Sequence, residues 1–219
     1  MSADPFLELL AARAKGAGLV ISDDSFEQLA AYFRLLSQWH NAINLTSLPL
    51  SPPTDQALDR LLIEPIAAAR LAGDFSGEWV DVGSGGGSPA IPFRIVQPRA
   101  RLTMVESRER KAAFLADVVR MLHLSATAVL NARLEDVARA AIPQSVDLVT
   151  VRGVRCDASL FASIHRLLRP TGRLFLFQSA GAQQVATGNF ESVTVAPLGT
   201  MDGDQLNILK PLFHVEQSD

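Results

Sequence analysis

The sequence has little of what several protein classes require. Its single cysteine, Cys156, excludes an internal disulfide, and none of its four histidines stands at metal-ligand spacing from that cysteine or from another histidine. The N-terminus lacks the basic-then-apolar order of a secretory signal, and the longest apolar stretches are of strand length or are interrupted by Arg and Pro. We therefore expect no bound metal, no membrane span and a cytoplasmic location.

Positive charge is also scarce. The formal net charge is -3 and the sequence pI is about 5.8, whereas proteins that hold nucleic acid by its phosphates usually carry a basic surplus. Composition alone therefore argues against a nucleic-acid ligand, unless basic side chains gather at one place.

Apolar residues, in contrast, make up 48% of the 219 residues, enough for a sizeable core. The first part of the chain predicts helices, because Asp4 precedes Pro5 and because Ser22 or Asp24 can cap a second helix. One face of that second helix is apolar and consists of Phe26, Leu29, Ala30, Phe33 and Leu36. With a further short helix near residues 58–71, we expect residues 1–72 to form a helical segment packed on the core.

Short apolar strands then alternate with helices, which is typical of an α/β fold. We expect strands at 79–82, 102–106, 128–130, 146–151 and 173–177, a helix after each of the first four, and a turn at Pro170-Thr171-Gly172. Residues 192–196 and 207–212 flank the turn-forming MDGD segment and predict a closing hairpin. Residues 73–219 are thus expected to form a Rossmann-like class I methyltransferase domain with a seven-stranded, mostly parallel sheet, joined to the helices in one compact unit.

The segment EWVDVGSGGGSPAIPF predicts a strand, a glycine loop and a helix start. Glycines such as Gly83 and Gly85 let a ligand approach the backbone closely. Glu106 ends the next predicted strand, 21 residues after Gly85, where a carboxylate can accept the hydroxyl protons of an adenosine ribose. The order of these features favours a nucleoside-binding loop over a plain glycine turn.

Two details separate the possible cofactors. An anionic pyrophosphate would be disfavoured beside Asp81 at the strand tip, whereas S-adenosylmethionine brings a sulfonium and an ammonium group and no phosphate. The third position of the dinucleotide fingerprint, normally Gly or Ala, is Ser88. We therefore expect S-adenosylmethionine, bound by Asp81, Gly83, Gly85, Ser88 and Glu106.

The segment NARLED follows the third predicted strand, where such sheets place a loop against the adenine edge. Glu135 and Asp136 fit that position, although an exposed helix cap is an equally good interpretation of the two acids. Ser107, directly after Glu106, is a further candidate for the cofactor site.

Five motifs resemble those of the RsmG (GidB) family: QWHNAINLTSL, VDVGSGGGSPAIPF, TMVESRERKAAFL, NARLED and VTVRGV. They stand in the family's order across roughly residues 25–180. The resemblance implies methyl transfer to N7 of a guanine in 16S ribosomal RNA. It also implies cofactor contacts at Gly83, Ser88, Leu134, Glu135 and Arg152.

Two segments depart from that family's pattern. The family usually has His-x-x-Asp-Ser-Leu where this chain reads DRLLIEP at 59–65, and often Lys-Gly where it reads QSAG at 178–181. The departures concern substrate recognition more than the cofactor.

The chemistry implied by the resemblance needs no general base, because guanine N7 already carries an in-plane lone pair. We therefore expect catalysis by positioning and no single catalytic residue. Amine methyltransferases commonly carry Asp/Asn-Pro-Pro-aromatic after the fourth strand, where this chain has TVRGVR. Arg152 could there reach the cofactor or a phosphate, and Cys156 is better explained as a packed residue than as a nucleophile.

Basic residues near the predicted cofactor edge are the candidates for RNA contact: Arg108, Arg110, Lys111 and Arg155. Arg60, Arg94, Arg99 and Arg101 could extend such a patch. The expected partner is 16S ribosomal RNA or the small ribosomal subunit, bound by a monomer. A methyltransferase of a small molecule or a protein, a non-catalytic ribosome-assembly factor and an NAD-dependent oxidoreductase are the alternatives.

Overall fold

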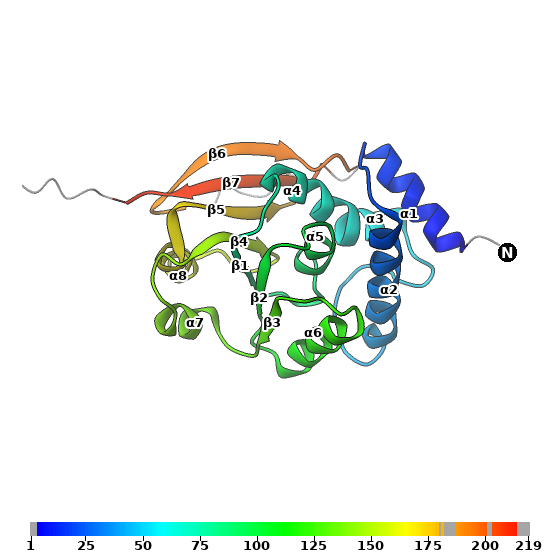
Figure 1. Cartoon of the computed structure of the whole chain (residues 1–219), viewed down its shortest axis with the longest axis horizontal. Helices are drawn as coiled ribbons and strands as arrows, with labels where there is room; N and C mark the ends of the chain where they lie inside the picture. Colours follow the sequence, from blue (N-terminus) through cyan, green and yellow to red (C-terminus); the bar gives the residue numbers. More distant parts are fainter. Residues whose placement is uncertain (1–3, 180, 182–186, 201–202, 214–219) are drawn as a thin grey trace, which may run out of the picture.

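The computed structural model describes residues 4–179, 181, 187–200 and 203–213. A seven-stranded sheet with strand order β3-β2-β1-β4-β5-β7-β6 forms its centre (Figure 1). The strands are β1 (Glu78–Val82), β2 (Arg101–Val105), β3 (Thr127–Leu130), β4 (Val146–Arg152), β5 (Leu168–Gln178), β6 (Phe190–Pro197) and β7 (Gln205–Pro211). The first five are parallel, and β7 pairs antiparallel with both β5 and β6. The expected fold is confirmed.

Helices connect the parallel strands as the sequence predicts. They are α5 (Ala90–Val96), α6 (Glu109–Met121), α7 (Leu134–Ala140) and α8 (Ala158–Leu167). The expected turn at Pro170-Thr171-Gly172 is wrong, because these residues lie inside β5. The pairing of β4 with β5 shifts register between Val146 and Leu148, so the extra residues are accommodated as an irregularity within the strand. The hairpin of β6 and β7 is confirmed; Met201 and Asp202 of its turn lie outside the described residues.

The N-terminal helices begin at the predicted caps. In α1 (Pro5–Gly16), the Asp4 carboxylate accepts a hydrogen bond from the Phe6 amide at 3.0 Å. In α2 (Asp23–His40), the Ser22 hydroxyl accepts one from the Ser25 amide at 3.3 Å. A third helical stretch comprises α3 (Asp55–Leu58), the π-helical turn η1 (Asp59–Ile63) and α4 (Glu64–Ala72).

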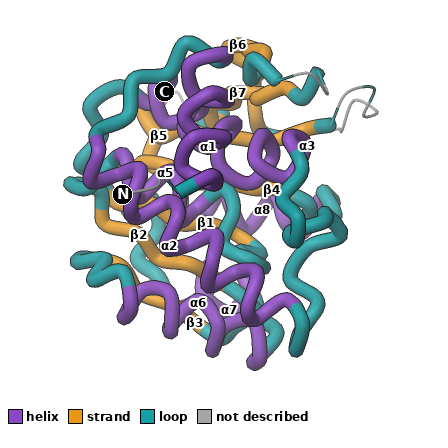
Figure 2. The backbone as a smooth tube through the Cα atoms, turned by 90° about the vertical axis from the view of Figure 1, so that its right-hand side faces the viewer, coloured by secondary structure: helices purple, strands orange, loops and turns teal. Residues whose placement is uncertain are grey.

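The two faces of the sheet bury separate sets of side chains, because successive residues of a strand point to opposite faces. Trp79 of β1 packs with the N-terminal helices, α5 and α6, while the adjacent Val80 packs with α7 and α8. Figure 1 shows these two groups of helices on either side of the sheet, and Figure 2 shows α1 and α2 lying in front of it. One apolar cluster therefore runs from Leu10 in α1 to Ile208 in β7.

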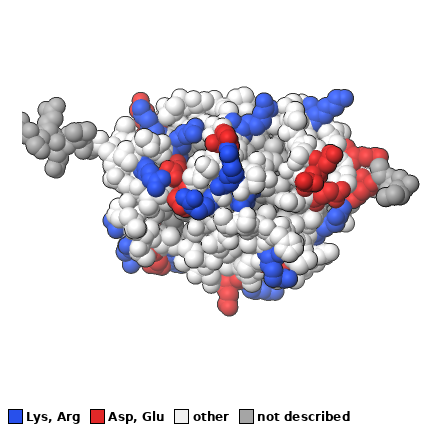
Figure 3. Space-filling view, viewed as in Figure 1, with Lys and Arg blue, Asp and Glu red and all other residues white. Residues whose placement is uncertain are grey.

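No helix among the described residues has both the length and the apolar character needed to cross a membrane, and no three His, Cys, Asp or Glu side chains among them are grouped to hold a metal ion. On the face shown in Figure 3, basic and acidic side chains are interspersed across the middle, and acidic ones gather at the right-hand end. That face therefore offers no broad basic surface.

Candidate functional site

A cavity of about 990 Å³ opens at the carboxyl ends of β1, β4 and β5. This is the edge at which doubly wound sheets bind their ligands. Its walls come from residues 45–49 after α2, from η1, from the glycine loop after β1, and from the ends of β4 and β5. Segments distant in the sequence therefore meet around one cavity.

The glycine loop requires glycine for two reasons. Gly83 and Gly85 adopt φ values of +66° and +55°, in the left-handed region that side chains disfavour. A Cβ atom at Gly83 would also lie 2.5 Å from Cγ2 of Val154. The main chain at this point is thus bare and lines the cavity.

Asp81 lies behind this loop, with only 1% of its surface exposed. A buried relay runs from the Trp79 indole N–H to the Thr150 hydroxyl at 2.9 Å, and from that hydroxyl to Oδ1 of Asp81. Oδ2 of Asp81 has no hydrogen-bond partner among the described residues.

Burial raises the pKa of Asp81 to about 7, and the charge of Glu106 acts in the same direction. Hydrogen bonds from Ser84 and Thr150 oppose the increase in this pKa. A cation placed nearby would favour the ionised carboxylate.

Glu106 follows β2 and is also buried, at 6% exposure. One carboxylate oxygen accepts from the Gly85 amide at 2.9 Å and the other from the Arg108 amide at 2.8 Å. Asn131 donates to the main-chain carbonyl of Glu106 at 2.9 Å. These bonds orient the carboxylate and leave each of its oxygens able to accept one more.

The cofactor residues predicted from the sequence lie at different depths. Gly83, Gly85, Ser88 and Arg152 line the cavity, whereas Asp81 and Glu106 lie directly behind its glycine wall. The remaining three are not among the lining residues: Ser107 is exposed, Leu134 is buried at the start of α7, and Glu135 is half-buried beside it.

The predicted RNA-contacting residues are divided in the same way. Lys111 lines the cavity, while Arg108, Arg110 and Arg155 are exposed outside it. Arg110 donates to the carbonyl of Ala42 at 3.2 Å.

The residues considered as extensions of a basic patch do not form one. Arg94 is 2% exposed and donates hydrogen bonds to the main chain and to Thr127, so it is a buried residue and not part of a surface patch. Arg99 and Arg101 pair with Asp74 and Glu78. Only Arg60 of this set lines the cavity.

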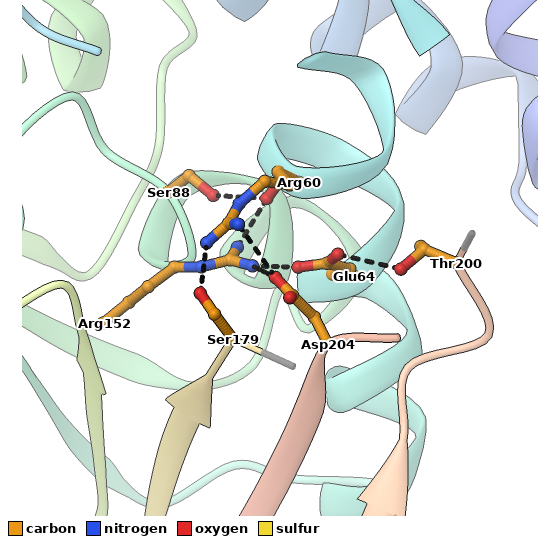
Figure 4. A network of polar contacts seen from close by, with 7 residues as sticks. All are labelled: Arg60, Glu64, Ser88, Arg152, Ser179, Thr200 and Asp204. Carbon is orange, nitrogen blue, oxygen red and sulfur yellow. Dashed lines mark hydrogen bonds and ion pairs between the residues drawn. The ribbon is translucent and has the colours of Figure 1, made fainter. Parts of the chain in front are cut away.

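A polar network that the sequence did not reveal occupies the other wall of the cavity (Figure 4). Arg152 forms an ion pair with the fully buried Glu64 and lies 3.7 Å from Asp204. Its guanidinium also stacks 5.0 Å from the ring centre of Phe177. Burial, together with the nearby charge of Arg60, lowers the pKa of Arg152 to about 9, although the charge of Asp204 acts in the opposite direction.

Arg60 joins this network through both its side chain and its main chain. The guanidinium lies 3.2 Å from Asp204 and donates to Ser179 at 3.3 Å. The carbonyl of Arg60 accepts from Ser88 at 3.3 Å and from Arg152. The two segments that depart from the family pattern, at 59–65 and 178–181, therefore contact each other; Ala180 lies outside the described residues.

The N-terminal helices close the back of the glycine loop. Tyr32 of α2 donates its hydroxyl to the Gly86 carbonyl at 2.7 Å. A Cβ at Gly86 would lie 3.0 Å from the carbonyl oxygen of Leu45. No motif in the sequence marks Tyr32 as a site residue, because its partner is a main-chain atom far along the chain.

Comparisons with known proteins agree with this geometry. A family model described as rRNA small subunit methyltransferase G (GidB) matches residues 25–196. A protein from Roseiflexus sp. named "Ribosomal RNA small subunit methyltransferase G" is 34% identical over 77% of this chain and 71% of its own length. A protein of the same name from Paracoccus denitrificans is 35% identical over 72% of this chain and 78% of its own.

Solved structures share the fold at low sequence identity. MtNAS in complex with S-adenosylmethionine is 15% identical with a TM-score of 0.59, covering 95% of this chain and 74% of that one. A SAM-dependent methyltransferase from Aquifex aeolicus is 12% identical with a TM-score of 0.56, covering 69% and 91%. At these identities the likeness concerns the fold alone.

Proposed function

Because the chain belongs to the rRNA small subunit methyltransferase G family, we propose that it transfers a methyl group from S-adenosylmethionine to N7 of a guanine in 16S ribosomal RNA. The observation that carries the proposal is the family match across residues 25–196, a span that includes the glycine loop, Glu106 and the end of β4. The fold agrees with a S-adenosylmethionine-dependent enzyme.

The polar groups around the cavity fit this cofactor. Oδ2 of Asp81 is a buried acceptor without a hydrogen-bond partner among the described residues, which suits a neighbouring sulfonium or ammonium. Glu106 is oriented by two amides and keeps acceptor capacity for ribose hydroxyls. Gly83, Gly85 and Ser88 line one wall of the cavity and Arg152 the adjoining one. We also assign Ser107, Leu134 and Glu135, which lie outside the lining, to the adenosine end of the cofactor.

Catalysis in this site is positioning. When bound, S-adenosylmethionine supplies an electrophilic methyl carbon. The guanine lone pair at N7 attacks without losing a proton, so no side chain has to act as a base. The chain's residues align the two reactants, exclude water and hold charge near the sulfonium.

The same proposal extends to the substrate side and to the environment of the enzyme. Lys111 reaches the cavity, and Arg108, Arg110 and Arg155 are exposed around it, where they would contact phosphates of 16S ribosomal RNA in the small subunit. We further propose a cytoplasmic monomer in which residues 1–72 are a helical segment of the same unit as residues 73–219.

The proposal is tested by incubating the protein with labelled S-adenosylmethionine and small ribosomal subunits that lack the modification, followed by mass mapping of the labelled nucleotide. We expect label on N7 of one guanine. Label confined to a metabolite or protein extract would instead favour a different substrate class, and cofactor binding without turnover on any ribosomal particle would favour an assembly factor.

The cofactor is tested separately by calorimetry with S-adenosylmethionine and NAD. Glu106→Ala should weaken S-adenosylmethionine binding by about 10- to 100-fold, since it removes a charged acceptor. Tight NAD binding with no response to S-adenosylmethionine would contradict the assignment.

A further inference from the structure

The cavity presents charge of only one sign. Among the described lining residues are three cations, Arg60, Lys111 and Arg152, and no Asp or Glu. The acids around the cavity are all at most 6% exposed and lie behind its walls: Glu64, Asp81, Glu106 and Asp204. An anionic ligand would therefore meet guanidinium and ammonium groups first, although the whole chain is acidic.

Arg152 and Arg60 differ in how exposed their side chains are and in how many contacts their guanidinium groups already make. Arg152 has 12% of its side chain exposed and contacts Glu64, the Phe177 ring and the carbonyl of Arg60. Arg60 has 29% of its side chain exposed. Its contacts with described residues are an ion pair with Asp204 and a hydrogen bond to Ser179, which leave several of the five guanidinium donors for a ligand.

Arg60 is also held in place before any ligand arrives. Asp204, at 3% exposure, lies 3.2 Å from its guanidinium. Its main-chain carbonyl is bound by Ser88 of the glycine loop and by Arg152 at the end of β4. A cation fixed in this way loses little conformational entropy when it binds a phosphate.

We propose that Arg60 binds a backbone phosphate of the RNA beside the target guanine, and that the buried Asp204 is the positioning residue that orients Arg60 for this contact. The proposal rests on the proposed function in taking RNA as the substrate. Figure 4 shows the arrangement: the Arg152 guanidinium is directed toward Glu64 and Asp204, and the Arg60 guanidinium toward Asp204 and Ser179.

The test is RNA binding at several salt concentrations by fluorescence anisotropy, with a single-stranded fragment of 16S ribosomal RNA as the probe. Arg60→Ala should weaken binding by about 10- to 100-fold. It should also reduce the slope of log affinity against log salt by about 0.7, the value for one phosphate contact on a single strand. Arg60→Ala keeps the carbonyl of residue 60, so the bonds from Ser88 and Arg152 remain.

The control is Arg99→Ala, which removes the same charge at the opposite edge of the sheet, where Arg99 is 61% exposed. It should leave both affinity and slope close to wild type. Arg60→Lys should keep the salt slope while recovering only part of the affinity, since an ammonium keeps the charge without the planar geometry.

Asp204→Asn tests the positioning role. It should raise KM for small subunits several-fold with kcat changed less, and the salt slope should stay at the wild-type value because Arg60 keeps its charge. Calorimetry with S-adenosylmethionine should give affinities within about threefold of wild type for both Arg60→Ala and Asp204→Asn.

Three results would overturn the proposal. One is an unchanged RNA affinity in Arg60→Ala; another is a weakened affinity with an unchanged salt slope, which would indicate a contact to a base. The third is a loss of S-adenosylmethionine affinity as large as the loss of RNA affinity in a variant that melts like wild type. Because RNA binding is measured without turnover, a wild-type protein that binds the fragment but transfers no methyl group would contradict the proposed function and not the role of Arg60.

Discussion

The two walls of the cavity are built in opposite ways. The glycine wall comes from one short segment after β1 and is backed by two buried acids, Asp81 and Glu106. The other wall, here called the arginine wall, is formed by η1, the ends of β4 and β5 and the start of β7. In it, Arg60 and Arg152 lie in front of the buried acids Asp204 and Glu64. One wall thus suits a cationic nucleoside and the other an anionic polymer, within a single cavity.

The largest effect should come from breaking the arginine wall at its buried acid. Glu64→Ala leaves Arg152 in the interior without its main partner and should lower the free energy of unfolding by about 3–5 kcal/mol. Urea denaturation followed by circular dichroism measures this difference.

The matched control is Glu78→Ala, which breaks an exposed pair with Arg101. It should cost about 0–1 kcal/mol, because solvent screens the pair. Equal losses in the two variants would contradict the view that Glu64 and Arg152 form a structural unit of the wall.

The next largest effect is expected at the glycine wall, where the affinity for S-adenosylmethionine should depend on pH. The pKa of Asp81 is about 7, so at pH 6 most of the carboxyl is protonated and must release a proton when a cation binds. S-adenosylmethionine binding should therefore tighten about five- to tenfold from pH 6 to pH 8. Calorimetry in buffers of different ionisation enthalpy should detect the released proton.

Asp81→Asn should remove this part of the pH dependence and weaken binding at pH 8 by about 1–2 kcal/mol. The ammonium group of the ligand titrates with both proteins, so the difference between them isolates Asp81. The same pH profile in wild type and Asp81→Asn would disprove the electrostatic role of this carboxylate.

The smallest effect should be at the contact between α2 and the glycine loop. Tyr32→Phe removes the donor to the Gly86 carbonyl and should weaken S-adenosylmethionine binding by about 1 kcal/mol. Burial raises the pKa of Tyr32, so the wild-type hydroxyl keeps its proton and the effect should not vary between pH 6 and pH 8. Ser37→Ala removes a hydroxyl that donates to the Phe33 carbonyl within α2 and should leave the affinity unchanged; an equal loss there would point to a general loosening of the helix.

The glycine wall could be predicted from the sequence because its parts are local. A strand, a loop of glycines and an acid at the end of the next strand stand in a fixed order, and parallel pairing of β1 with β2 brings Asp81 and Glu106 together. The helix caps and the closing hairpin were predictable for the same reason, since each depends on residues a few positions apart.

The arginine wall could not be predicted in this way. Arg60 and Asp204 are separated by most of the chain, and they meet only because β7 inserts between β5 and β6. The sequence does not indicate whether a charged residue will be buried. Arg94, for example, is a candidate for a surface patch in the sequence but is buried in the interior. The departures at 59–65 and 178–181 did indicate unusual segments, but not that they touch.

The late position of Asp204 in the chain has a consequence for biosynthesis. Polypeptides leave the ribosome N-terminus first, so the glycine loop and Arg60 emerge well before Asp204, the acid that orients Arg60. The surface proposed to bind ribosomal RNA is therefore incomplete until residue 204 has been synthesised, and a shorter nascent chain is poorly equipped to bind the particle that is making it.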